Sequence, residues 1–257
     1  MNTVLAALPR IGLAELEERA ALQTRVDRKY ILPVGEAGWL LETLAPDAVV
    51  LEIDGIRRFT YESRYFDTPE LSSYHRTAHR HRRRFKVRTR MYVDSGTCWL
   101  EVKVPGPRGS TVKYRAPHEP DLPHSVGTGL AFLDEVFARH GLTAASRAGL
   151  TPVLRTAYLR FTLLLPDTDS RVTVDTDLRW SADGRELRLP QVAIVETKTG
   201  STASGADRQL WRRGHRPVAI SKYATGLAAL RADLPAAPWR RVLRRHFTAA
   251  REELVHG

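Results

Sequence analysis

Basic side chains occupy every second position in the segment 84–90, and the residues between them are mostly apolar. Successive side chains of a β-strand point to opposite faces, so these basic residues would line one face of an extended strand. If that face were turned towards the protein interior, each unpaired charge would cost several kcal/mol. A polyphosphate anion would compensate for such charges, whereas a solvated outer face or edge would need no ligand. The basic residues are Arg84, Lys86, Arg88 and Arg90, and they alternate with Phe85, Val87 and Thr89.

The same alternation recurs in other segments. Two of them end in a Glu-x-Lys pair, Glu101-x-Lys103 and Glu196-x-Lys198, which suggests two related strands that present the same carboxylate and ammonium groups. Antiparallel sheets often expose one polar face, so an open sheet would leave these charges in water. A closed sheet would instead enclose them in a charged tunnel. The remaining alternating segments carry Lys113 and Arg115, and then Arg171, Thr173, Asp175 and Asp177.

The composition is typical of a globular protein that binds anions. The 257 residues are 42% hydrophobic, which is enough to build a sizeable core, and they carry a formal net charge of +11. This charge favours nucleic acid, an anionic membrane or a phosphate-rich small molecule as the ligand. The single cysteine, Cys98, excludes an intrachain disulfide framework and a cysteine-based zinc cluster.

No targeting or membrane-spanning segment is predicted. Residues 1–8 lack the basic start and the sustained apolar core of a secretory signal. The longest later apolar runs, such as residues 161–165, are far too short to cross a bilayer. We therefore expect a cytoplasmic protein without a membrane segment, and the sequence does not identify a membrane-protein partner.

Helix and strand patterns follow one another along the chain without a domain linker or a convincing repeat. About eight strands, with helices at the ends and outside, predict one α+β domain over residues 1–257 with a core of about 25–230. We expect its antiparallel sheet to close into a barrel or tunnel, although the pattern also fits an open sheet. The expected helices are 14–24, 35–44, 130–140, 221–230 and 239–254, the expected strands include 25–32, 58–67 and 151–160, and the expected connections are a hairpin at 105–109 and a mobile loop at 201–205.

Seven short motifs occur in order between Arg25 and about Leu230. They are Arg25-x-Asp27-x-Lys29-Tyr30, Tyr65-Phe66-Asp67-Thr68, Lys86-x-Arg88-x-Arg90, Glu101-x-Lys103, Lys113-x-Arg115, Glu196-x-Lys198 and Ser221-Lys222-Tyr223. In this order they resemble the catalytic domain of the vacuolar transporter chaperone (VTC) family of polyphosphate polymerases. That family belongs with the triphosphate tunnel metalloenzymes, so the resemblance implies an antiparallel tunnel that holds a triphosphate and a divalent metal. The first motif departs from the Glu-x-Glu-x-Lys of many tunnel enzymes, because Arg25 replaces the first carboxylate with a cation.

The resemblance and the charge pattern together predict which residues act on phosphate. Arg can donate to two phosphate oxygens at once, while Lys supplies a compact charge. Glu196 is expected to be the first metal ligand and Glu101 the second, with Mn²⁺ or Mg²⁺ as the cofactor, because oxygen ligands suit both ions. Each glutamate has an alternative role in a salt bridge with Lys198 or Lys103. The expected catalytic residues are Arg88, Arg90, Lys103, Glu196 and Lys198, and the expected phosphate-binding residues are Lys29, Lys86, Lys113, Arg155, Arg160, Arg171 and Lys222.

The resemblance implies a polyphosphate polymerase that transfers the γ-phosphoryl group of ATP to the end of an inorganic polyphosphate chain and releases ADP. Such a reaction needs positioning and charge neutralisation rather than a nucleophilic side chain, so Cys98 and the histidines are expected to be packing or surface residues. A metal-dependent triphosphatase and a non-catalytic polyphosphate or polyanion-binding module are the alternatives. ATP and inorganic polyphosphate are the expected partners, and no specific nucleic acid is expected because Phe85 alternates away from the cations.

Overall fold

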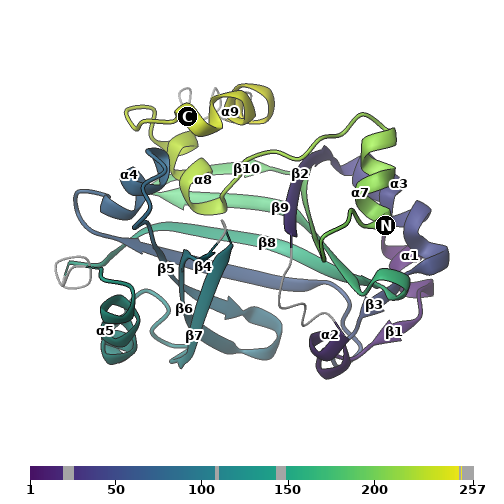
Figure 1. Ribbon diagram of the computed structural model, residues 1–257, viewed down its shortest axis with the longest axis horizontal. Helices are drawn as coiled ribbons and strands as arrows, with labels where there is room; N and C mark the ends of the chain where they lie inside the picture. The colour runs from purple at the N-terminus through teal and green to yellow at the C-terminus, as the bar shows by residue number, and fades with distance from the viewer. Residues whose placement is uncertain (20–25, 108–109, 143–148, 249, 251–257) are drawn as a thin grey trace. The chain divides into compact units, whose positions relative to one another are not determined.

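The computed structural model in Figure 1 describes residues 1–19, 26–107, 110–142, 149–248 and 250. The chain forms two compact units, each assembled from three separate stretches of sequence. Unit 1 contains residues 1–59, 158–178 and 189–219, and unit 2 contains residues 60–157, 179–188 and 220–257. Two long strands, β8 (Thr151–Leu165) and β9 (Ser170–Ala182), contribute to both units. One domain over residues 1–257 stays a prediction.

Unit 1 is built on a largely antiparallel sheet. Its strand order is β2-β11-β9-β8-β3-β1, in which only β1 and β3 pair in parallel among the pairings with a described register. The short connection between β8 and β9 is the 3-10 turn η5 (Pro166–Thr168), which makes them a hairpin. Besides β8 and β9, the strands are β2 (Val26–Pro33), β11 (Val192–Thr199), β3 (Val49–Leu51) and β1 (Arg10–Ile11).

Helices cover one face of the unit 1 sheet. Leu40 of α3 and Leu210 of α7 belong to one buried cluster with strand residues such as Leu32, Phe161 and Val195. Strand side chains alternate between the two faces, so the opposite face carries the polar residues of the same strands. Figure 1 shows α3 and α7 side by side. The helices are α1 (Asn2–Ala7), α2 (Leu13–Arg19), α3 (Val34–Leu44) with the 3-10 turn η1 (Ala45–Asp47), and α7 (Gly205–Arg212).

Unit 2 is an antiparallel meander that continues from the first part of β8. The strand order is β8-β4-β5-β6-β7, and β10 pairs with β9. Val87, Leu100 and Val102 pack on Leu133 and Phe137 of α5, so α5 covers the apolar face of this sheet. The strands are β4 (Phe59–Asp67), β5 (Lys86–Tyr92), β6 (Thr97–Pro105), β7 (Thr111–His118) and β10 (Arg185–Leu189).

The other helices of unit 2 follow the strands. They are α4 (Ser72–Ala78), α5 (Leu130–Arg139), α8 (Lys222–Leu230) and α9 (Arg240–His246), with 3-10 turns η2 (Val93–Ser95), η4 (Gly127–Gly129) and η6 (Ala237–Trp239). Tyr74 of α4 packs against Tyr223 of α8 and Trp239, and its hydroxyl donates to the Pro235 carbonyl at 3.1 Å. These contacts fix α8 beside α4 in unit 2.

The sheet is open, which corrects the expectation of a closed barrel. Among the strands that the structure describes, β2 pairs with β11 alone and β7 with β6 alone, whereas a barrel requires its end strands to pair. β7 has the features of an edge strand, because Pro117 removes a backbone donor and the exposed Lys113 and Arg115 discourage further pairing. The α+β class, the antiparallel pairing and the flanking helices are confirmed.

Several element boundaries differ from the sequence prediction. Within the first predicted helix the structure describes α2 up to Arg19, and within the last it describes α9 up to His246. Residues 20–25, 249 and 251–254 lie outside the described part of the chain, and Arg25 of the first motif is among them. The segment 201–205 leads into α7, which the sequence pattern did not reveal. Over the described ranges, no helix is both long and apolar enough to span a membrane.

Candidate functional site

The alternating cations of unit 2 lie on one face of three neighbouring strands. Arg88 of β5 is directly opposite Glu101 of β6, which is opposite Arg115 of β7. Directly opposed residues share a face of the sheet. Arg88, Glu101 and Arg115 therefore form one row across this face, and Lys86, Lys103 and Lys113 form a second row. Arg90 of β5 is opposite Trp99.

Glu101 is the only carboxylate that the described strands place in these two rows, and it is buried with 1% exposure. Its Oε2 accepts hydrogen bonds from Nε and Nη2 of Arg88 at 2.7 and 2.5 Å, and Oε1 lies 3.5 Å from Nζ of Lys113. Burial opposes ionisation, but Arg88, Arg90, Lys113 and Lys103 together hold the pKa of Glu101 well below its usual range. Four cations therefore surround this one carboxylate, an arrangement that suits the binding of a multiply charged anion.

Aromatic rings fix the arginines of this face. The guanidinium of Arg88 donates to the hydroxyl of Tyr65 at 3.0 Å, and Tyr65 in turn stacks on Tyr223 with a centroid separation of 5.2 Å. Arg90 lies over the ring of Tyr61 at 5.5 Å from its centroid. Held side chains lose less conformational entropy when they bind a ligand, so this face is organised before an anion arrives.

The Ser221-Lys222-Tyr223 motif forms the beginning of α8. Ser221 caps the helix, and its hydroxyl also accepts a 3.0 Å hydrogen bond from Nζ of Lys86. Tyr223 donates to the buried carboxylate of Asp67, which also accepts from the backbone amides of Ser73 and Tyr74 at 2.8 Å. Burial raises the pKa of Asp67 in spite of these hydrogen bonds. Three of the sequence motifs therefore meet in unit 2, and Lys222 lies beside the serine that contacts Lys86.

A second charged cluster lies on the polar face of unit 1. Glu196 of β11 is opposite Lys29 of β2 on one side and Thr173 of β9 on the other. Its Oε1 forms ion pairs with Lys198 and with Lys29, the latter at 3.4 Å, and Lys198 also donates to Asp27 at 3.2 Å. Burial opposes ionisation, but Lys198 and Lys29 keep the pKa of Glu196 well below its usual range.

Arg160 and Arg171 complete the unit 1 cluster. Arg160 of β8 forms a two-pronged pair with Asp175 of β9, at 2.6 and 2.8 Å, and Arg171 is directly opposite Lys198. The cluster holds four cations, Lys29, Arg160, Arg171 and Lys198, against three carboxylates, Asp27, Asp175 and Glu196, which leaves one positive charge in excess. Its charges are therefore much more nearly balanced than those around Glu101.

Arg155 differs from the other predicted phosphate-binding residues. It forms an ion pair with Glu62 of β4, and Glu62 is directly opposite Met91, the residue that alternates with Arg90 on β5. Arg155 therefore lies on the face of unit 2 opposite to Arg88 and Arg90. This placement favours a structural role for Arg155, which makes it a control for the residues of the cationic face.

Acid is expected to destabilise the protein through Glu101 and Glu196. Both have pKa values lowered from 4.5, so the stability they contribute is fully present above about pH 4.5 and is lost as the pH falls below that value. Asp67 has the opposite effect on stability, because burial raises its pKa and its protonation in acid therefore favours the folded state. Thermal denaturation over a pH series measures the net effect. Glu101→Gln should flatten the acid limb, whereas equal acid sensitivity in this variant and the parent would contradict the assignment.

Comparison with known families tests the resemblance that the motifs indicated. The model of the VTC domain matches residues 24–231. The chain belongs to the VTC domain family. No curated protein sequence matches the chain significantly.

Solved structures are similar to this VTC domain, and the first of them has the same fold. A putative adenylate cyclase from Bacillus halodurans is 13% identical, has a TM-score of 0.52, and the match covers 79% of this chain and 96% of that one. A putative adenylyl cyclase from Hippeastrum, described as having a dominant triphosphatase activity, is 15% identical with a TM-score of 0.48, and the match covers 79% of this chain and 94% of that one. At such identities the first likeness shows the fold alone, which confirms the α+β antiparallel sheet with flanking helices.

The two predicted metal ligands of the VTC domain are not equivalent. Both carboxylate oxygens of Glu101 face cations, an environment that repels a divalent ion. Glu196 contacts Lys198 and Lys29 through Oε1, and its Oε2 makes no hydrogen bond to a described residue. Within the described ranges, no three Asp, Glu, His or Cys side chains gather as a metal site. Glu196 can therefore supply one oxygen ligand, and the phosphates would have to supply others.

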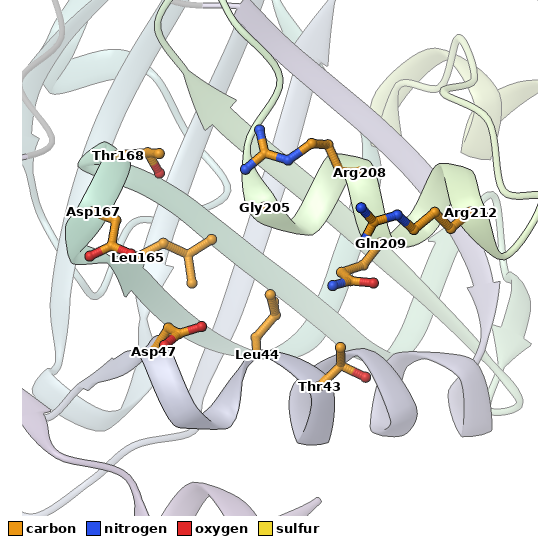
Figure 2. A pocket seen from close by; sticks show the side chains of 10 residues that line it. All are labelled: Thr43, Leu44, Asp47, Leu165, Asp167, Thr168, Gly205, Arg208, Gln209 and Arg212. Atoms are coloured by element: carbon orange, nitrogen blue, oxygen red, sulfur yellow. The ribbon is translucent and has the colours of Figure 1, made fainter.

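A cavity of about 260 Å³ lies on the helical side of unit 1, apart from both charged clusters. Figure 2 shows Arg208 and Arg212 of α7 on one wall and Asp47 and Asp167 on the other. None of the predicted phosphate-binding residues lines it. The charged residues that line it balance, with two arginines and two aspartates.

Sequence reasoning missed the residues that hold the cations in place. Asp175 pairs with Arg160, Tyr65 contacts Arg88, and Ser221 contacts Lys86. Asp175 could have been found, because it falls in the alternating segment 171–177. The roles of Tyr65 and Ser221 depend on the strand register and on the docking of α8, for which the sequence pattern gives no signal.

Proposed function

We propose that this VTC domain is a polyphosphate polymerase that uses ATP as its phosphoryl donor. The observation that carries the proposal is the gathering of four cations around the buried Glu101, in a chain that belongs to the VTC domain family. Membership of this family supports a function in handling polyphosphate or nucleoside triphosphate. A buried carboxylate surrounded by four cations favours their charged form and positions them on one face of the sheet.

In the proposed reaction, a terminal oxygen of the acceptor phosphate chain attacks the γ-phosphorus of ATP. The bond from the γ-phosphorus to the β,γ-bridging oxygen breaks, and ADP leaves with that oxygen. Arg88, Arg90 and Lys103 of unit 2 would neutralise charge on the phosphoryl oxygens, and Lys198 of unit 1 is a further candidate for a catalytic residue. A bound Mn²⁺ or Mg²⁺, with Glu196 as one ligand, would neutralise further charge on the triphosphate. No covalent intermediate on a side chain is required.

Incubation of the purified protein with ATP and Mn²⁺ tests the polymerase. We expect ADP to accumulate together with acid-labile phosphate chains that an exopolyphosphatase digests. Orthophosphate as the sole phosphate product would favour the triphosphatase instead, and an absence of nucleotide turnover would favour a binding module.

Glu196→Gln is expected to reduce turnover strongly while leaving the fold intact, because the amide keeps the size of the side chain but removes the charge. Glu62→Gln, on the opposite face of unit 2, serves as the control for a glutamate outside the two clusters. Turnover of Glu196→Gln equal to that of the parent at saturating ATP and metal would reject the role of Glu196.

A further inference from the structure

The connection between α4 and β5 in unit 2 is strongly basic. Residues 75–84, here called the basic segment, contain five arginines and three histidines. The longer stretch 71–93 contains no aspartate or glutamate. The arginines are Arg76, Arg80, Arg82, Arg83 and Arg84, and the histidines are His75, His79 and His81.

The cations at the centre of the basic segment are exposed and pair with no carboxylate of the described residues. Arg80, Arg82 and Arg83 are exposed, and within the described residues none of their side chains forms an ion pair or a hydrogen bond. Neighbouring like charges repel one another, so such a cluster is unfavourable unless an anion neutralises it. This distinguishes the segment from most arginines of the charged clusters, which are paired.

The backbone of the basic segment is fixed by the two arginines at its ends. Arg76 donates to the carbonyl of Arg83 at 2.9 Å, and Arg84 donates to the carbonyl of His81 at 3.0 Å. The end of α4 is closed by hydrogen bonds from the amide of His81 to the carbonyl of Arg76 at 2.8 Å and from Arg80 to Thr77 at 3.2 Å. The segment therefore presents its central arginines from a defined turn.

Arg80 occupies a backbone position that glycine normally takes. Its φ of +56° lies in the left-handed region, at the residue that follows the helix end. A side chain is disfavoured there, so this sequence keeps a cation where conformation alone would select glycine. A residue that strains the backbone points to a role for its side chain.

The basic segment leads directly into the cationic face of β5. Lys86 and Arg88 follow Arg84 at every second position, and Lys86 contacts Ser221. The aromatic residues that flank the segment, Tyr74 and Phe85, are fully buried at 0% and 1% exposure. The exposed rings of the segment are the imidazoles of His79 and His81, and no Phe, Tyr or Trp ring of the described segment is exposed. Single-stranded nucleic acid is normally held by such larger rings as well as cations, so this surface favours an anion without bases.

We propose that the basic segment is a docking surface for the extended part of a long inorganic polyphosphate chain, outside the region that binds the triphosphate. The proposal rests on the proposed handling of polyphosphate by this domain, but it concerns binding and requires no catalysis. Arg80, Arg82 and Arg83 supply the contacts, while Arg76 and Arg84 hold the turn. A chain too short to reach beyond the cationic face of β5 gains nothing from the segment.

Binding of long-chain polyphosphate and of tripolyphosphate to the full chain, measured by calorimetry without ATP, tests the proposal. For the triple variant Arg80→Gln, Arg82→Gln and Arg83→Gln, we expect affinity for the long chain to fall by about tenfold or more. The slope of log affinity against log salt should decrease by about three, one for each cation removed. Affinity for tripolyphosphate should change by less than about twofold, because the triphosphate region is untouched.

The matched control removes three exposed arginines of α9, with Arg240→Gln, Arg241→Gln and Arg244→Gln, which lower the net charge equally. An equal loss of long-chain affinity in this control would show a general charge effect and overturn the proposal.

A further variant, Arg80→Gly, separates binding from folding. It should weaken long-chain binding, and its melting temperature should be no lower than that of the parent. Unchanged long-chain affinity in the triple variant, with a loss instead for single-stranded RNA or for vesicles containing phosphatidylserine, would also overturn it. A further outcome is that the protein makes no polyphosphate while its binding of the long chain still depends on the basic segment. That result would refute the proposed polymerase activity and leave the docking surface in place.

Discussion

Replacing Glu101 by alanine is expected to lower the free energy of unfolding by about 3–5 kcal/mol, because it leaves the buried guanidinium of Arg88 without its partner. Arg88 is 7% exposed and donates two of its hydrogen bonds to Glu101. The remaining cations around this position would then repel one another without a compensating charge. Urea denaturation followed by circular dichroism measures the loss.

Glu62→Ala provides the matched comparison for this stability prediction. Its ion pair with Arg155 joins side chains that are 32% and 41% exposed, and such partly exposed pairs contribute only about 0–1 kcal/mol. If Glu101→Ala and Glu62→Ala lower the free energy of unfolding by similar amounts, the cations around position 101 do not need the Glu101 carboxylate for stability. A phosphate ligand that stabilises Glu101→Ala more than the parent would instead support the binding of an anion at this position.

Replacing Arg90 by alanine is expected to weaken nucleotide binding and to slow phosphoryl transfer, with a combined cost of about 2 kcal/mol or about 30-fold in kcat/KM. Arg90 lies on the cationic face and contributes to the positive field at Glu101. Calorimetry with ATP and initial rates of ADP release separate the loss of ground-state binding from the loss of transition-state stabilisation.

Arg155→Ala is the control for Arg90→Ala. Arg155 was among the residues that the sequence suggested for phosphate binding, but it lies on the opposite face beside Glu62. It should retain the nucleotide affinity and the turnover of the parent. Equal losses in the two variants would place the site elsewhere, and unchanged ATP binding in Arg90→Ala would exclude Arg90 from it.

The sequence by itself determined the charged strands, several of the helices and the local charge pattern. Alternation with a period of two is a property of neighbouring residues, so the strands around Arg88, Glu101 and Glu196 could be predicted without their partners. The helices α3 and α5 were visible for the same reason, through the spacing of their apolar residues. The order of the motifs indicated the VTC domain family, which the family model confirmed.

Only the tertiary structure decided which of these residues meet. Strand register set Glu101 among its cations, and the pairing of β8 with β4 turned Arg155 to the other face, since a shift of one residue reverses every side chain. Closure of a sheet depends on whether its end strands pair, and alternation is identical in open and closed sheets, so the open edge at β7 could not be read from the sequence. The arginines of the basic segment could be read from the sequence. Whether a described carboxylate lies close enough to pair with them depends on which residues the fold brings together.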